Sequence, residues 1–218
     1  MLRSEVRTST ALSINEIYPS VQGEGLLIGK PCLFVRFQGC NLRCPWCDEP
    51  SALSFKRANT DLKELLQELQ KYPQKHVVLT GGEPFAEPNL HLLVQELLCR
   101  GYSVQIETNG TLWNENLREV VSQVHITCSP KGVADWYVHP AVLSSAKELK
   151  FVVDHEFCYN VIKRREFMPF LEEGLVVLQP EGNKTKFLQK ALELQNLLLR
   201  EGYTVRVVPQ MHKLIGLK

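Results

Sequence analysis

Short apolar runs alternate with amphipathic stretches along most of the chain. Each run has the length of a buried strand and ends in polar or glycine-rich residues. The runs predict strands over residues 31–37, 76–84, 102–110, 124–131, 148–154, 174–182 and 204–213. Helical periodicity predicts helices over residues 61–71, 89–100, 115–121 and 186–201, and a loop over 132–145. In the last helix we expect these side chains to face inward: Phe187, Ala191, Leu194, Leu197 and Leu198.

This order of elements indicates an α/β fold. Apolar strands that alternate with helices are typical of a parallel sheet covered by helices. The chain holds about six βα units and a last strand, whereas about eight units close a full barrel. Residues 11–25 begin like an edge strand and end in Gln22-Gly23-Glu24-Gly25, which the pattern alone favours as an ordinary hairpin turn. We therefore predict a partial, open β/α barrel with an N-terminal hairpin, one domain over residues 1–218, with residues 1–10 as a loose tail.

Composition and charge exclude several classes of protein. The formal net charge of +1 gives no strong field that would attract nucleic acid or a membrane surface. No apolar run approaches the length of about 20 residues that spans a bilayer, and the N-terminus lacks the apolar region of a secretory signal. Seven cysteines, an odd number, do not suggest a disulfide scaffold. We expect a cytoplasmic protein with reduced thiols and neither a nucleic-acid nor a membrane partner.

Three of the cysteines lie close together, directly after the predicted strand at 31–37. Cys40, Cys44 and Cys47 have the spacing C-x₃-C-x₂-C in the stretch GCNLRCPWCDEP. Three thiolates can hold a soft metal centre and leave one coordination position open. A zinc site would need a fourth ligand, and a redox CxxC pair would leave Cys40 without a role. A [4Fe–4S] cluster therefore fits best. We read the four remaining cysteines as buried small hydrophobes: Cys32, Cys99, Cys128 and Cys158.

Polar or glycine-rich residues also follow the other predicted strands. Because the carboxyl ends of parallel strands meet at one rim, where α/β enzymes build their active sites, these residues should lie close together. Any one of these endings could be turn chemistry, but six at one rim indicate a binding site. The endings are Gln38-Gly39-Cys40, Thr80-Gly81-Gly82-Glu83-Pro84, Glu107-Thr108-Asn109-Gly110, Ser129-Pro130-Lys131, Gln179-Pro180-Glu181 and Gln210-Met211-His212.

Together these motifs resemble the radical S-adenosylmethionine superfamily. The resemblance is closer to one branch, the 7-carboxy-7-deazaguanine synthases of queuosine biosynthesis, and it covers nearly the whole chain. The cysteine motif is specific only to the superfamily, whereas QGEG, CSPK and the terminal Q-x-HK narrow it to the branch. The resemblance implies a carbon–nitrogen lyase with a [4Fe–4S] cluster and S-adenosylmethionine. It would contract the ring of 6-carboxy-5,6,7,8-tetrahydropterin to 7-carboxy-7-deazaguanine, with loss of ammonia.

The resemblance also implies roles for individual residues. Cys40, Cys44 and Cys47 would hold the cluster. The S-adenosylmethionine site would include Trp46, Gly82, Glu83, Ser129, Pro130, Lys131, Gln179, Pro180 and Glu181. The pterin substrate would contact Val21, Gln22, Gly23, Arg36, Thr80 and the C-terminal Lys218. Arg36 near the rim also suits a carboxylate by its own chemistry. An electron donor such as flavodoxin and a homodimer are further expectations.

Glu49 departs from the family pattern, which often has a threonine there whose hydroxyl helps to hold Mg²⁺. A carboxylate could bind Mg²⁺ directly or exclude it by its bulk. We expect either that a divalent cation is used or that a rearranged site tolerates its absence. Two other functions remain open. A glycyl-radical-enzyme activase shares the CNLRCPxC loop but would not need QGEG or CSPK. A catalytically silent iron–sulfur protein would not need the intact strand endings.

Overall fold

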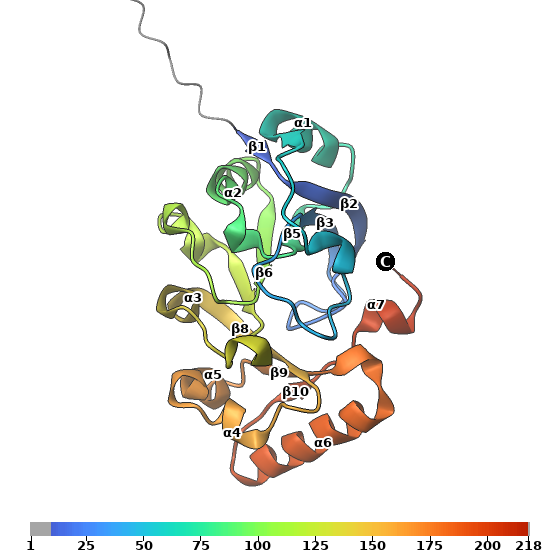
Figure 1. Cartoon of the computed structure of the whole chain (residues 1–218), viewed down its shortest axis with the longest axis vertical. Coiled ribbons are helices and arrows are strands. Elements are labelled where there is room, and N and C mark those ends of the chain that lie inside the picture. The colour runs from blue at the N-terminus through green and yellow to red at the C-terminus, as the bar shows by residue number, and fades with distance from the viewer. Residues whose placement is uncertain (1–9, 218) are drawn as a thin grey trace, which may run out of the picture.

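A computed structural model describes residues 10–217 of the chain, and an eight-stranded sheet forms its centre (Figure 1). The strand order is β10-β9-β8-β7-β6-β5-β3-β2. The strands that pair in parallel are β3 (Pro31–Phe37), β5 (His76–Gly81), β6 (Ser103–Thr108), β7 (His125–Cys128), β8 (Ala146–Val153), β9 (Val176–Pro180) and β10 (Arg206–Val207). β2 (Ile14–Val21) pairs antiparallel with β3 as the predicted hairpin. β2 and β10 lie at the two edges of the sheet and do not pair with each other. The described residues therefore form the open barrel that the sequence predicts.

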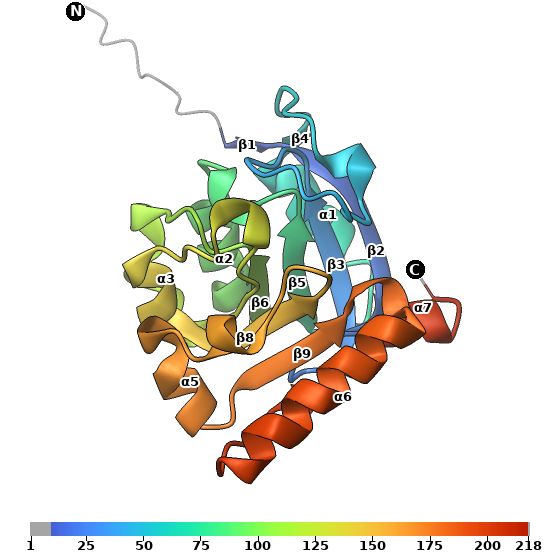
Figure 2. The ribbon, with the colours of Figure 1, turned by 60° about the horizontal axis from the view of Figure 1, so that its bottom comes forward.

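Helices cover the outer face of this curved sheet, as Figures 1 and 2 show from two sides. They are α1 (Leu62–Leu69), α2 (Leu90–Cys99), α3 (Pro140–Ser145), α4 (Tyr159–Ile162), α5 (Met168–Glu172) and α6 (Thr185–Arg200). α7 (Met211–Leu214) lies instead beside the N-terminal hairpin, where Met211 N donates to Gly23 O at 3.0 Å. A separate pair of short strands, β1 (Ala11–Leu12) and β4 (Thr60–Asp61), lies beside α1. In the described part of the chain, every helix is too short or too polar to cross a membrane.

The strands alternate between an apolar outer face and an inner face that carries buried polar side chains beside a small apolar cluster of Cys32, Phe34 and Val78. In β8, Leu149, Phe151 and Val153 pack into the main hydrophobic core under the helices. Glu148 and Lys150 point the other way and are nevertheless buried. Because successive side chains of a strand point to opposite faces, the apolar residues hold the helices while the polar ones line the barrel interior. The fold thereby gathers buried polar groups at one place.

Three elements differ from the sequence prediction. α3 forms within the expected loop because His139 caps it, accepting a hydrogen bond from Ala141 N at 3.2 Å, and because Pro140 suits a first helical turn. The helix predicted over 115–121 is a pair of 3₁₀ turns, Glu115–Leu117 and Val121–Gln123. The last strand is only Arg206–Val207, since Pro209 cannot donate to a sheet, and the chain then turns into α7.

Some expectations about burial were also wrong. Leu197 is 42% exposed, because α6 turns Leu194 and Leu198 inward instead. Cys99 and Cys158 are exposed at helix ends, whereas Cys32 and Cys128 are buried as expected. Of the predicted tail, residues 1–9 lie outside the described part. Thr10 is not loose, since its hydroxyl donates to Asp61 at 3.0 Å.

Candidate active site

A cavity of about 420 Å³ opens at the carboxyl edge of the parallel strands, inside the curve of the sheet. Its size suits a small-molecule ligand. The predicted site residues that line it are Val21, Gln22, Arg36, Cys40, Cys44, Trp46, Cys47, Glu49, Thr80, Gly82, Ser129, Lys131, Gln179 and Glu181. Gly23, Glu83, Pro130 and Pro180 are not among the lining residues, and Lys218 lies outside the described residues. The predicted convergence of strand endings at one rim is therefore present.

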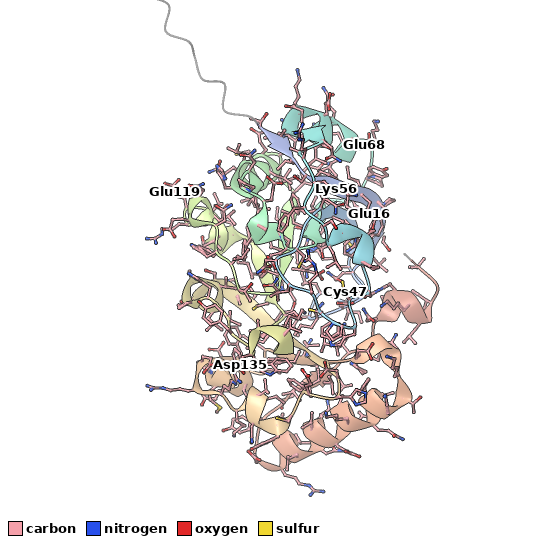
Figure 3. All side chains as sticks on the ribbon, in the orientation of Figure 1. Glu16, Cys47, Lys56, Glu68, Glu119 and Asp135 are labelled. Carbon is pink, nitrogen blue, oxygen red and sulfur yellow. The ribbon has the colours of Figure 1, made fainter. Side chains whose placement is uncertain are left out.

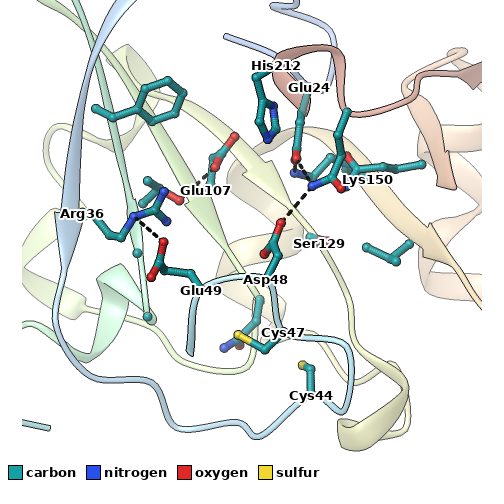
Figure 4. Close-up of a pocket in the computed structure, with 18 of the residues that line it drawn as sticks. Glu24, Arg36, Cys44, Cys47, Asp48, Glu49, Glu107, Ser129, Lys150 and His212 are labelled. Atoms are coloured by element: carbon teal, nitrogen blue, oxygen red, sulfur yellow. Dashed lines mark hydrogen bonds and ion pairs between the residues drawn. The ribbon is translucent and has the colours of Figure 1, made fainter. Parts of the chain in front are cut away.

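The cysteine loop is fastened at both of its sides. Gly39 N and Cys40 N donate to the carbonyls of Ala52 and Leu53 at 2.8 and 3.0 Å. A Cβ on Gly82 would lie 1.9 Å from the Gly39 carbonyl oxygen, so only glycine allows β5 to end against the loop. Cys47 lies near the middle of the molecule in Figure 3, and Cys44 and Cys47 line the cavity, as Figure 4 shows.

Glu83 supports the rim from below the cavity. Its carboxylate is 1% exposed and accepts hydrogen bonds from Thr108 Oγ1 at 2.7 Å, Asn109 N at 2.7 Å and Phe85 N at 3.0 Å. Burial raises the pKa of Glu83, and these donors oppose that rise. Glu83 thus joins the ends of β5 and β6. Its role towards S-adenosylmethionine stays a prediction.

Trp46, between the last two cysteines, is held in one orientation. Its Nε1 donates to Asp154 Oδ2 at 2.6 Å, at the end of β8. Lys131 Nζ lies 5.4 Å from the centre of the indole ring and donates to Ser129 Oγ at 2.5 Å. Burial, and then the charge of Lys150, lower the pKa of Lys131. This wall of the cavity therefore offers an aromatic face and a desolvated amine.

Gln179 leaves a buried polar atom without a partner. The residue is 4% exposed and lines the cavity, yet its Oε1 accepts no hydrogen bond within the described residues. Such an atom costs about 1–3 kcal/mol unless a ligand supplies a donor. An ammonium or hydroxyl group of a ligand, both of which S-adenosylmethionine carries, would satisfy it.

Arg36 forms a second corner of the cavity, shown on the left of Figure 4. Its Nε donates to Glu16 Oε1 at 2.8 Å, and one Nη2 hydrogen is donated to Tyr18 Oη at 3.0 Å. Glu49 Oε2 lies 3.6 Å from the same Nε. Glu49 Oε1 accepts a hydrogen bond from Ser51 Oγ. A guanidinium is thus bordered by two carboxylates.

The hairpin turn at Gln22-Gly23-Glu24-Gly25 is part of the cavity wall as well as a turn. Gln22 N donates to Lys30 O at 2.8 Å, which closes the hairpin. The Gln22 side chain reaches inward and donates to Gln105 and Glu107 at 3.0 and 3.1 Å. Thr80 Oγ1 donates to the other oxygen of Glu107 at 2.9 Å. The ordinary-turn interpretation therefore captures the backbone but misses the buried network.

A charged network that the sequence did not predict joins the hairpin, the cysteine loop and the C-terminal segment. Lys150 forms an ion pair with Glu24, and both side chains are nearly buried, at 8% and 13% exposure. Gln210 Nε2 donates to Glu24 at 2.7 Å and to Asp48 at 3.0 Å. Burial opposes the charge of Lys150, but Glu24 and Glu107 outweigh it and raise the pKa of Lys150. Lys150 lies in a strand that also carries Lys147 and Glu148, so nothing in the sequence marked it as the partner of Glu24.

The fold and the thiol-lined cavity define a class of protein. The family model described as the radical SAM superfamily matches residues 34–142, which is half of the chain. The structure of Streptococcus suis SuiB bound to S-adenosylmethionine matches with a TM-score of 0.52 over 78% of this chain and 44% of SuiB. At 16% identity that match concerns the fold alone. The chain belongs to the radical SAM superfamily.

Comparisons with single proteins narrow this class to a family. The 7-carboxy-7-deazaguanine synthase of Aquifex aeolicus is 59% identical over 100% of both chains. That of Hyperthermus butylicus is 31% identical over 96% of this chain and 94% of its own. The crystal structure of QueE from Escherichia coli matches with a TM-score of 0.66 and 28% identity, over 92% of this chain and 94% of that one. The chain belongs to the 7-carboxy-7-deazaguanine synthases, which confirms the predicted resemblance.

Proposed function

We propose that the chain catalyses the reaction for which its relatives are named. It would convert 6-carboxy-5,6,7,8-tetrahydropterin to 7-carboxy-7-deazaguanine and ammonia. The observation that carries this proposal is that one cavity brings together the three thiols, the unpaired Gln179 oxygen and the Arg36 guanidinium. A radical source and a carboxylated substrate therefore have adjacent places in it.

The donors present fit the cluster and S-adenosylmethionine. Cys40, Cys44 and Cys47 would hold a [4Fe–4S] cluster, and Gln179 and Lys131 would face an ammonium or hydroxyl and a carboxylate of S-adenosylmethionine. When bound, the two groups supply a carbon-centred radical that takes a hydrogen atom from the substrate. The protein orients the ligands and excludes water, and Asp154 keeps Trp46 in place beside them.

The other corner would bind the pterin. Arg36 would take its carboxylate, and Thr80, with Val21, Gln22 and Gly23 of the hairpin, would contact the ring. Lys218 is proposed as a further contact from the C-terminus. The pair Lys150 and Glu24 would complete the polar wall. Gln22 Nε2 already donates hydrogen bonds to Gln105 and Glu107. Gln22 would therefore contact the substrate through its backbone and not through its side-chain amide nitrogen.

Glu49, the residue at which the sequence suggests a Mg²⁺ ligand, already has other partners. The Glu49 carboxylate is already in contact with Arg36 and Ser51. A Mg²⁺ ion bound by the Glu49 carboxylate would have to displace these two contacts, and the proposed reaction is written without the ion.

Anaerobic reconstitution tests the function. Enzyme with cluster, S-adenosylmethionine and reductant should form 5′-deoxyadenosine and 7-carboxy-7-deazaguanine only when the carboxytetrahydropterin is added, and Cys44→Ala should abolish both. If 5′-deoxyadenosine formed only with a glycine-containing protein partner, the chain would be an activase. If neither product formed, it would be a silent iron–sulfur protein.

We also propose a cytoplasmic homodimer that takes electrons from a donor such as flavodoxin. The open barrel supports the dimer, because the edge strands β2 and β10 leave backbone groups that a neighbouring surface can cover. Light scattering would show a mass of about twice 24.9 kDa. A monomer at micromolar concentration would contradict it.

A further inference from the structure

Among residues 10–217, the corner around Arg36 carries more negative than positive charge. One guanidinium lies between the carboxylates of Glu16 and Glu49, and the three side chains are only 16%, 20% and 28% exposed. The proposed substrate brings a third carboxylate to the same place. Because partly buried like charges repel strongly, the corner cannot hold all three carboxylates in its present arrangement.

The two resident carboxylates are held differently. Glu16 on β2 is the cross-strand partner of Arg36 on β3, so the sheet fixes it beside the guanidinium. Glu49 lies on the loop after the cysteines, just before the 3₁₀ turn at Pro50–Ala52. At 3.6 Å from Nε it makes a charge contact and no hydrogen bond, since the Nε hydrogen is donated to Glu16. Glu49 is therefore the carboxylate that can leave.

Arg36 keeps donors free for a new ligand. A guanidinium has five N–H groups in a planar fork, of which Glu16 and Tyr18 take two. A carboxylate that forms two short hydrogen bonds to this fork gains more than Glu49 loses at its longer distance. Glu49 also has Ser51 Oγ as a donor that does not depend on Arg36.

We propose that Glu49 is an internal substitute for the substrate carboxylate. It balances the charge of Arg36 in the free enzyme and gives way when the substrate carboxylate binds. The inference rests on the proposed function, in which Arg36 binds that group. Because Glu49 leaves the guanidinium when the substrate carboxylate arrives, no divalent cation is needed between the two carboxylates. Figure 4 shows Glu49 and Arg36 side by side, apart from the Lys150 network.

The variant Glu49→Gln separates this proposal from a cation site. The reconstituted enzyme with S-adenosylmethionine, EDTA and no reductant binds ligands without turnover. Calorimetry should then show that Glu49→Gln binds 6-carboxy-5,6,7,8-tetrahydropterin about tenfold more tightly than wild type, because no resident carboxylate then competes with the substrate for the Arg36 guanidinium. Tetrahydropterin without the carboxylate should bind both enzymes equally. Adding Mg²⁺ in place of EDTA should change neither result.

Two further variants make the test specific. Glu68→Gln also removes a carboxylate from an ion pair, with Lys71, but on the outer helix α1 away from Cys47 (Figure 3), and it should leave affinity unchanged. On an Arg36→Met background, Glu49→Gln should give no gain. Weaker or unchanged binding by Glu49→Gln, or a Mg²⁺-dependent gain in wild type alone, would overturn the proposal. If wild type bound no carboxytetrahydropterin at all, the proposed function itself would fail.

Discussion

At the scale of single residues, the absence of a Cβ on Gly82 determines how closely β5 can approach the cysteine loop. The Gly82 backbone lies against the Gly39 carbonyl, and no positive φ requires glycine there. Gly82→Ala should therefore lower iron incorporation at least severalfold and destabilise the fold by about 2–4 kcal/mol, because the cysteine loop must move. Iron analysis and denaturant unfolding would measure this. Gly132→Ala is the matched control, since its Cβ would meet side-chain atoms, Glu156 Oε2 at 3.0 Å and the Trp136 ring at 3.2 Å, and no backbone carbonyl. Equal iron content in both variants would contradict this explanation.

Lys150 offers a second test at this scale. Lys150→Met leaves Glu24 buried without its cation, and breaking a buried pair in this way costs about 3–5 kcal/mol. Denaturant unfolding should show that loss at neutral pH. Lys150→Met combined with Glu24→Gln should recover part of it, because no charge is then left unpaired. A double variant less stable than Lys150→Met would contradict the ion pair.

The same pair predicts a direction of pH dependence. Burial alone would raise the pKa of Glu24, but Lys150 outweighs burial and holds the pKa below its ordinary value of 4.5. The unfolded chain takes up a proton first on acidification, so this stabilisation is complete above about pH 4.5 and is lost as pH falls through the lowered pKa. The difference in unfolding free energy between wild type and Lys150→Met should thus shrink in acid. A difference that grew below that pH would exclude this account.

The sequence predicted site residues where a motif marks them and missed those that tertiary pairing creates. Arg36 and the three cysteines follow from their position at a strand end. Glu24 was read only as part of a turn, and its partner Lys150 is 126 residues away in the chain. A lone sequence carries no signal for that distance.

At the scale of elements, the C-terminal segment acts as a strap across the hairpin and the cysteine loop. Met211 N donates to Gly23 O at 3.0 Å, and buried Gln210 joins Glu24 to Asp48. Gln210→Leu should raise the KM for the pterin about tenfold and increase 5′-deoxyadenosine formed per product, because the substrate side loosens more than the thiols. Product ratios by chromatography would measure this.

Lys213→Met is the comparison for that strap. Its bond to Asp48 is 2.7 Å long, but both side chains are substantially exposed, so its loss should cost little. An effect as large as that of Gln210→Leu would show that the exposed pair, not the buried amide, holds the segment. α7 itself was missed because four residues carry too little periodicity to predict a helix.

At the scale of the whole molecule, the parallel sheet and its openness followed from the sequence because they depend on repeated, local patterns. Alternation of strands and helices predicted a parallel sheet, and the number of units predicted an incomplete barrel. The polar inner face did not follow, because its side chains are paired only once the sheet curves. The dimer and the electron donor stay predictions, since both concern surfaces that one chain does not define.

Transfer of deuterium tests the central claim most directly, that one cavity holds the radical source beside the carboxylated pterin. The substrate would carry deuterium in place of the carbon-bound hydrogens of its reduced ring. Mass spectrometry of a single anaerobic turnover should show deuterium in 5′-deoxyadenosine together with the deazaguanine product, and neither with Cys44→Ala. Formation of the product with unlabelled 5′-deoxyadenosine would contradict the account.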